Sequence, residues 1–179
     1  EALWPEKYDL AFFAAAKANN PRQFAAIHQQ SPRAREGNMF KLKDLPIVNA
    51  APVAGRRVRY WDLGGSDSNK ADFTVGLLMN AAPDGLFYIE DVERGQWSPR
   101  ERNERIRTTA ERDKAAHVET WIERVPGLAV EVVDELVRYL AGYSVRTEMA
   151  RQDKTTRADP LASQCEAGNV RVVKADWNA

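Results

Sequence analysis

Two acidic residues end hydrophobic segments in a pattern that is typical of metal-dependent chemistry. Asp62 lies near the end of residues 57–63 and Glu123 ends residues 118–123, and both segments have the composition of strands. If the two residues lie on adjacent strands, ~5 Å apart, their carboxylates repel each other, and burial increases the free-energy cost of this repulsion. Mg²⁺ or Mn²⁺ suits such oxygen ligands and removes the penalty. Two such ions can hold the attacking and leaving oxygens of a phosphodiester, so we expect Asp62 and Glu123 to be catalytic and to bind metal.

Further charged residues could assist this chemistry. Asp72 is expected to open a second strand beside Asp62 and Asp67 lies on the intervening loop, so both are candidate metal ligands. Lys154 and Arg157 introduce a later predicted helix and could contact phosphates. Each residue also fits a plain alternative, because acids stabilise turns and exposed turns carry cations. The glycines at 64 and 65 could leave space for a phosphate backbone or could simply form a turn.

Composition excludes several classes of protein. Lys+Arg number 26 and Asp+Glu number 26 among 179 residues, so the net charge is zero and no strongly basic coat is present for binding nucleic acid. The single cysteine, Cys165, excludes an internal disulfide framework and a multi-cysteine zinc site. No apolar run approaches the ~18 residues of a membrane helix, so we expect no membrane association.

The chain alternates between strand and helix patterns after residue 55. Strands are predicted at 57–63, 72–79, 86–92, 118–123, 144–149 and 170–174, and helices at 99–113, 128–140 and 155–167. Ser98, Pro99 and Glu101 form a capping-box signature at the start of the first of these helices. Residues 1–55 read as an extension with two short helices, the second beginning at Pro21 after a possible Asn20 cap.

The lengths of the connections predict the order of the strands. Short turns join the first three strands as an antiparallel meander, and right-handed crossovers place the fourth strand parallel to the first, at its free edge. The result is an α/β fold with a mixed five-stranded sheet of order 3-2-1-4-5, flanked by helices. That topology is RNase H-like, and it occupies the predicted domain 56–179.

Six segments carry a resemblance to a known family. They are YWDL at 60–63, DFTVG at 72–76, DVERGQWSP at 91–99, WIE at 121–123, KTTRADPLA at 154–162 and EAGNV at 166–170. With them the chain resembles the C-terminal nuclease domain of terminase large subunits of tailed phages and prophages. Residues 1–55 resemble the segment that links the ATPase domain of those proteins to the nuclease.

The resemblance implies a metal-dependent endonuclease that cleaves double-stranded DNA in the cytoplasm of a bacterial host. It assigns the catalytic acids to Asp62 and Glu123 and implies two Mg²⁺ or Mn²⁺ ions. Its implied partners are the terminase small subunit, the portal protein and an N-terminal ATPase domain. The family's further catalytic aspartate, in a His-Asp-Asp-type motif, has no match here. We therefore expect the protein to continue beyond Ala179 and its activity to need those residues.

Two other functions remain open at this point. A Holliday-junction resolvase or another RNase H-like nuclease would share the strand that ends in Ile122 and Glu123. A non-catalytic DNA-binding or assembly module would use the same fold without metal, with residues 1–55 docking a partner. A choice between branched junctions and linear duplex distinguishes a resolvase from a terminase nuclease. Binding of a divalent metal near Asp62 distinguishes a nuclease from a non-catalytic module.

Overall fold

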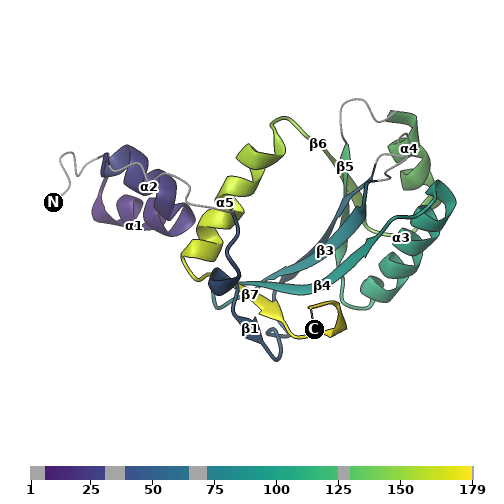
Figure 1. The fold of residues 1–179 in the computed structure, drawn as a ribbon, viewed down its shortest axis with the longest axis horizontal. Helices are drawn as coiled ribbons and strands as arrows, with labels where there is room; N and C mark the ends of the chain where they lie inside the picture. The colour runs from purple at the N-terminus through teal and green to yellow at the C-terminus, as the bar shows by residue number, and fades with distance from the viewer. Residues whose placement is uncertain (1–6, 31–38, 65–71, 125–129, 179) are drawn as a thin grey trace. The chain divides into compact units, whose positions relative to one another are not determined.

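A computed structural model describes residues 7–30, 39–64, 72–124 and 130–178 (Figure 1). The chain divides into two units, one of residues 1–46 and 152–171 and the other of residues 47–151 and 172–179. The larger unit holds the sheet on which the acidic residues lie. Each unit is described separately below.

Within the described residues, seven strands form one sheet of order β1-β7-β4-β3-β2-β5-β6. They are β1 (Ile47–Val48), β2 (Arg56–Asp62), β3 (Thr74–Ala81), β4 (Phe87–Gly95), β5 (Glu119–Arg124), β6 (Val145–Met149) and β7 (Val170–Val173). The β2–β3 and β3–β4 pairs are antiparallel, whereas β2–β5 and β5–β6 are parallel. The predicted order 3-2-1-4-5 is confirmed as β4-β3-β2-β5-β6. Two short strands, β7 and β1, extend the sheet beyond β4.

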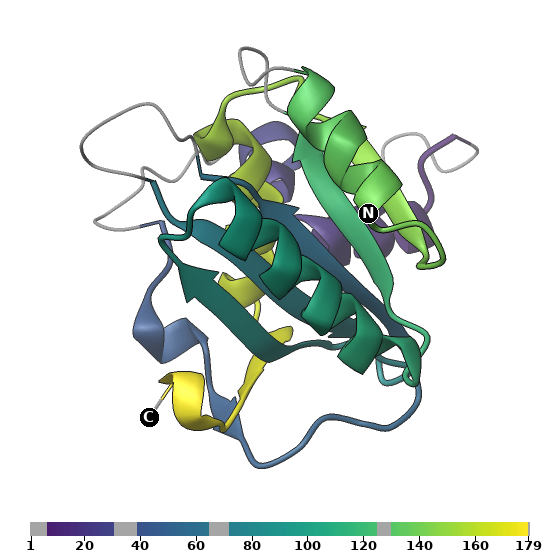
Figure 2. The same ribbon diagram turned by 90° about the vertical axis from the view of Figure 1, so that its right-hand side faces the viewer.

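Helices α3 (Pro99–Lys114) and α4 (Val130–Tyr139) pack against one face of this sheet. Figure 2 shows α3, in teal, lying in front of the strands. The core between the helices and the sheet consists of Trp61, Leu63, Ile106, Ile122, Val133, Leu136 and Leu140. The predicted capping box is present, since the Ser98 hydroxyl accepts from the Glu101 backbone N–H and the Glu101 carboxylate accepts from the Ser98 N–H. This cap fixes the start of α3.

The smaller unit contains α1 (Leu10–Asn19), α2 (Pro21–His28), the 3₁₀ turn η1 (Leu42–Asp44) and α5 (Lys154–Glu166). The Asn20 side chain caps α2 as predicted, by accepting from the backbone N–H of Gln23. The ring of His28 packs edge-on against Phe13 and tilted against Phe24, with centroids 5.3 and 5.1 Å away. None of the helices in the described residues is long and apolar enough to cross a membrane.

A buried cluster of charges fastens α3 to the sheet. Arg59, on β2, is 1% exposed and its guanidinium donates from Nε to Asp113 of α3 and from Nη2 to Asp91 of β4, the latter at 2.8 Å. Asp91 also accepts from Arg112 at 2.8 Å. Bidentate and charge-assisted bonds of this kind hold three elements in one geometry. Asp91 therefore has a structural role in this cluster.

We predict that Arg59→Ala lowers the free energy of unfolding by ~3–5 kcal/mol, because it leaves the buried Asp113 carboxylate without its main partner. Urea unfolding followed by circular dichroism measures the change. Arg56→Ala is the control, since Arg56 lies on the same strand and pairs with Glu119 but its side chain is 67% exposed. Its effect is expected to be much smaller. Equal effects of the two variants would contradict the role assigned to burial.

Candidate functional site

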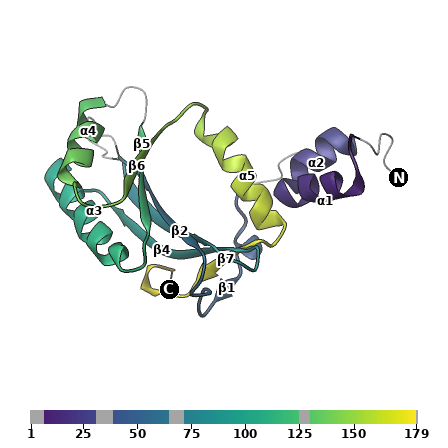
Figure 3. The same cartoon turned by 180° about the vertical axis from the view of Figure 1, so that it is seen from behind.

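The register of two parallel strands brings the predicted catalytic acids together. Trp61 of β2 pairs with Ile122 of β5 as the last pair of the ladder, and Asp62 and Glu123 are the next residue along each strand, so the register sets them beside each other. Trp61 and Ile122 are fully buried beneath α3 and α4. Because side chains alternate along a strand, Asp62 and Glu123 lie on the opposite face of the sheet. Figure 3 shows β2, β5 and β6 from behind.

The environment of this acid pair fits a divalent cation. Glu123 is only 4% exposed and Asp62 is half-buried, so two like charges stand on neighbouring strands with reduced access to water. Like charges on neighbouring strands repel each other, and a divalent cation bound between them removes that repulsion. Carboxylate oxygens are the donors that Mg²⁺ and Mn²⁺ prefer. The residues present therefore suit a hard metal ion.

The structure adds a third acid to the same row, which the sequence reasoning missed. Glu148 of β6 pairs with Glu123 in the parallel register and so lies on the same face, although it is exposed. Glu148 lies within the predicted strand 144–149, but its position beside Glu123 follows only from the register of β5 with β6. Across the described ranges, no three His, Cys, Asp or Glu side chains gather closely enough to hold a metal ion.

The strand ladders do not pair the other predicted site residues with Asp62 or Glu123, and the roles proposed for these residues stay predictions. Asp72 is exposed and precedes β3, which begins at Thr74 rather than at 72, and Val75 is the residue opposite Asp62. Asp67 lies outside the described residues. Lys154 and Arg157 lie in the first turn of α5, in the smaller unit, where Arg157 donates from Nε to the Gln152 carbonyl at 3.1 Å. The DNA-binding role of these two cations stays a prediction.

Comparison with known proteins identifies the family. Residues 59–179, more than half of the chain, match the family model described as the terminase RNaseH-like domain. The chain belongs to this family. The match confirms the resemblance that the sequence motifs indicated. No curated protein matches the chain.

Solved structures agree with the fold of this terminase domain. One is the large terminase nuclease from thermophilic phage G20c with bound zinc, which is 17% identical, with 79% of this chain and 84% of that chain covered and a TM-score of 0.51. Another is the same phage's nuclease with bound magnesium, which is 15% identical, with coverage of 80% and 78% and a TM-score of 0.51. At these identities the likeness shows the fold alone, which is the RNase H-like fold expected from the order of the strands.

Two glycines of the terminase domain allow close packing next to Asp62. A Cβ atom on Gly76 would lie 2.7 Å from the indole ring of Trp61, and one on Gly64 would lie 2.2 Å from the Asp72 carbonyl oxygen. The space at Gly64 is thus filled by the chain's own backbone, so the idea that this glycine makes room for a phosphate is wrong. Gly65 lies outside the described residues. Gly76 lets Trp61 lie directly against β3, which fixes the residue before Asp62.

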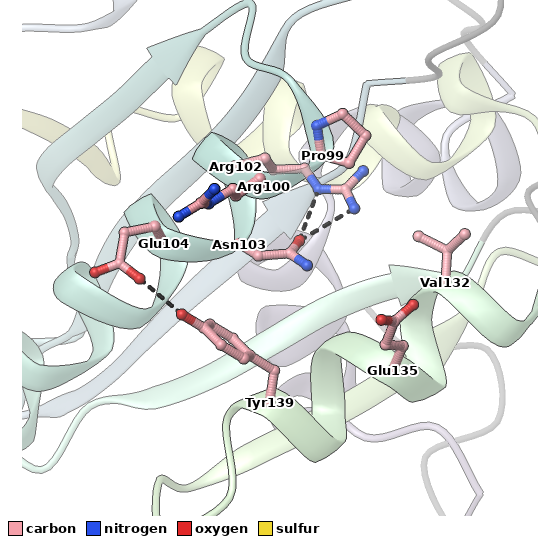
Figure 4. Close-up of a pocket in the computed structure, with 8 residues that line it drawn as sticks. All are labelled: Pro99, Arg100, Arg102, Asn103, Glu104, Val132, Glu135 and Tyr139. Atoms are coloured by element: carbon pink, nitrogen blue, oxygen red, sulfur yellow. Dashed lines mark hydrogen bonds between the residues drawn. The ribbon is translucent and has the colours of Figure 1, made fainter.

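A pocket of about 590 Å³ lies between α3 and α4, on the helix-covered side of the sheet (Figure 4). Its Arg102 is 4% exposed, donates to Asn103 Oδ1 at 3.1 and 3.2 Å, and has a pKa lowered by burial. Hydrogen bonds from Arg107 and Tyr139 lower the pKa of Glu104 to about 2. The acid pair faces the other way, so this pocket is separate from the candidate metal site.

We predict that Gly76→Ala lowers the free energy of unfolding by ~1–3 kcal/mol, because the added methyl group displaces the Trp61 ring. Urea denaturation with tryptophan fluorescence measures the loss. The double variant Gly76→Ala with Trp61→Phe tests the cause, since a smaller ring relieves the clash. The double variant should then lose less free energy of unfolding than the sum of the losses in Gly76→Ala and in Trp61→Phe. Strict additivity would show that the glycine acts through something other than Trp61.

Proposed function

We propose that this chain is the nuclease part of a terminase large subunit and that it cleaves double-stranded DNA by metal-dependent hydrolysis of a phosphodiester. The proposal rests on one observation, the placement of Asp62 and Glu123 as neighbours on one face of the sheet. Family membership supports the same reading. The magnesium and zinc seen in the G20c nuclease belong to that protein, and they agree with the choice of a divalent ion here.

Asp62 and Glu123 would be the residues that hold the ions, which we propose to be two Mg²⁺ or Mn²⁺. When bound, such ions supply an activated water and stabilise charge on the leaving oxygen. The chain itself contributes by holding the two carboxylates in position. The β-ladder fixes both carboxylates at the carboxyl ends of parallel strands, where ligands bind in open α/β sheets. The burial of Glu123 limits access of bulk water to one side of the pair.

The charge balance bears on how the substrate is held. With 26 cations and 26 anions, the chain has no excess charge to attract a polyanion. We therefore assign most of the affinity for DNA to other parts of the terminase. Within this chain, we propose that Lys154 and Arg157 contact phosphates. An ATPase domain joined through residues 1–55, the small subunit and the portal protein are the proposed partners. The proposed location is the cytoplasm of a bacterial host.

The decisive experiment measures metal binding before activity. Mn²⁺ titration followed by electron paramagnetic resonance should show binding to the unaltered chain, weakened ~10-fold or more in Asp62→Asn and in Glu123→Gln, since loss even of outer partners costs ~10–100-fold. Glu131→Gln is the control, because Glu131 is an exposed acid on α4. Mn²⁺-dependent plasmid cleavage is then assayed in a protein that extends beyond Ala179.

The variants should abolish cleavage, and the control should retain it. Mn²⁺ binding and cleavage that survive in Asp62→Asn would overturn the proposed mechanism. Cleavage of branched junctions in preference to linear duplex would favour a resolvase instead of a terminase nuclease. Duplex binding without any Mn²⁺ binding would favour a non-catalytic module.

A further inference from the structure

Arg94 of β4 is connected to Asp62 by two successive cross-strand pairs. Asp62 pairs with Val75 of β3, and Val75 pairs with Arg94 of β4. Residues directly opposite each other in antiparallel strands point to the same side of the sheet. Arg94 therefore lies on the face that carries Asp62 and Glu123. Two strand spacings separate the backbones of Arg94 and Asp62, which is ~10 Å.

Within the described ranges, the Arg94 side chain stacks on an aromatic ring and forms no ion pair with a carboxylate. Its guanidinium carbon lies 3.3 Å from the centroid of the Phe73 ring, which is 39% exposed. Phe73 precedes β3 at the edge where β2 ends, so the stacked pair lies toward the same edge as Asp62. Stacking leaves the N–H groups in the plane of the guanidinium available, since only its flat face contacts the ring.

The arginines of β2 behave differently. Arg56 pairs with Glu119, Arg57 with Glu90, and Arg59 with Asp91 and Asp113. In the part of the chain that the structure describes, no carboxylate lies within ion-pair distance of Arg94. The Arg94 side chain is also exposed. Among the described residues it is thus a cation oriented by stacking that has no ion-pair partner, on the face that also carries Asp62 and Glu123.

We propose that Arg94, stacked on Phe73, binds a backbone phosphate of the DNA strand that lies across the acid pair. This inference rests on the proposed function and adds a substrate contact to it. A guanidinium matches the geometry of a phosphate with two parallel hydrogen bonds. The Phe73 ring reduces the side-chain entropy lost on binding, because it already restricts the guanidinium. The ~10 Å offset corresponds to a phosphate a few nucleotides from the acid pair, at a rise of ~3.4 Å per step.

The test measures how duplex binding depends on salt. Binding of a short fluorescent duplex is followed by anisotropy at several KCl concentrations, once with EDTA and once with Ca²⁺. Loss of one phosphate contact should weaken binding several-fold at low salt and reduce the slope of log K against log[salt] by ~1. Arg94→Ala should show both changes, whatever the DNA sequence. Arg94→Lys should keep the slope because it keeps the charge.

Two further variants separate a phosphate contact from a packing role. Phe73→Leu should weaken binding without changing the slope, because it removes the stacking but no charge. Arg138→Ala is the matched control, since Arg138 is an exposed arginine on α4, over the other face of the sheet, and its removal should leave affinity and slope unchanged. Thermal unfolding of each variant confirms that the fold is intact.

The outcomes distinguish this inference from the proposed function. A reduced slope in Arg94→Ala together with unchanged Mn²⁺ binding supports the contact. An unchanged slope in both EDTA and Ca²⁺, an equal loss in Arg138→Ala, or no measurable duplex binding by the unaltered chain at low salt overturns it. A reduced slope with no Mn²⁺ binding by any variant supports the contact and overturns the metal-dependent mechanism.

Discussion

The parallel pairing of β2 with β5 is the constraint on which the candidate site depends. It joins two strands that are more than 50 residues apart in the chain, and its register alone decides that Asp62 stands beside Glu123. A slip of β2 by one residue would turn Asp62 toward the helices and Trp61 toward the opposite face of the sheet. Because Trp61 fills the core between the sheet and α3 and α4, such a slip would expose a large apolar side chain. Packing of Trp61 and Ile122 on the helix-covered face thus fixes the register that places Asp62 and Glu123 on the opposite face.

The charged groups near β2 serve two different purposes. Arg59 is buried with carboxylates of opposite sign, so its charge is compensated within the protein and links β2, β4 and α3. Asp62 and Glu123 bring together two charges of the same sign, an arrangement that favours the binding of a cation. Local arrangements that oppose stability are expected where function requires them. The rigid Arg59 cluster lies on the strand that carries Asp62, so it supports the position of the acid.

The sequence predicted the parts of this structure that depend on local patterns. The capping box at Ser98, the Asn20 cap and the strand order β4-β3-β2-β5-β6 follow from short-range signals and from the handedness of crossovers. The pairing of β1 with β7 was not predictable, because it joins short segments across more than a hundred residues. Glu148 was missed for a similar reason. Its place beside Glu123 depends on register, which a single strand does not encode.

The same distinction explains why Arg94 was not evident from the sequence. In the sequence it lies within the segment 91–99 that carries the family resemblance, but neither that segment nor the balanced total charge indicates a phosphate contact. Its significance comes from two antiparallel registers that carry it into the row of Asp62, and from the ring of Phe73 that replaces a carboxylate partner. A protein without net charge can still present a cation to a phosphate where its own acids leave one uncompensated. The distribution of ion pairs over the sheet, and not their number, therefore determines where a polyanion can approach.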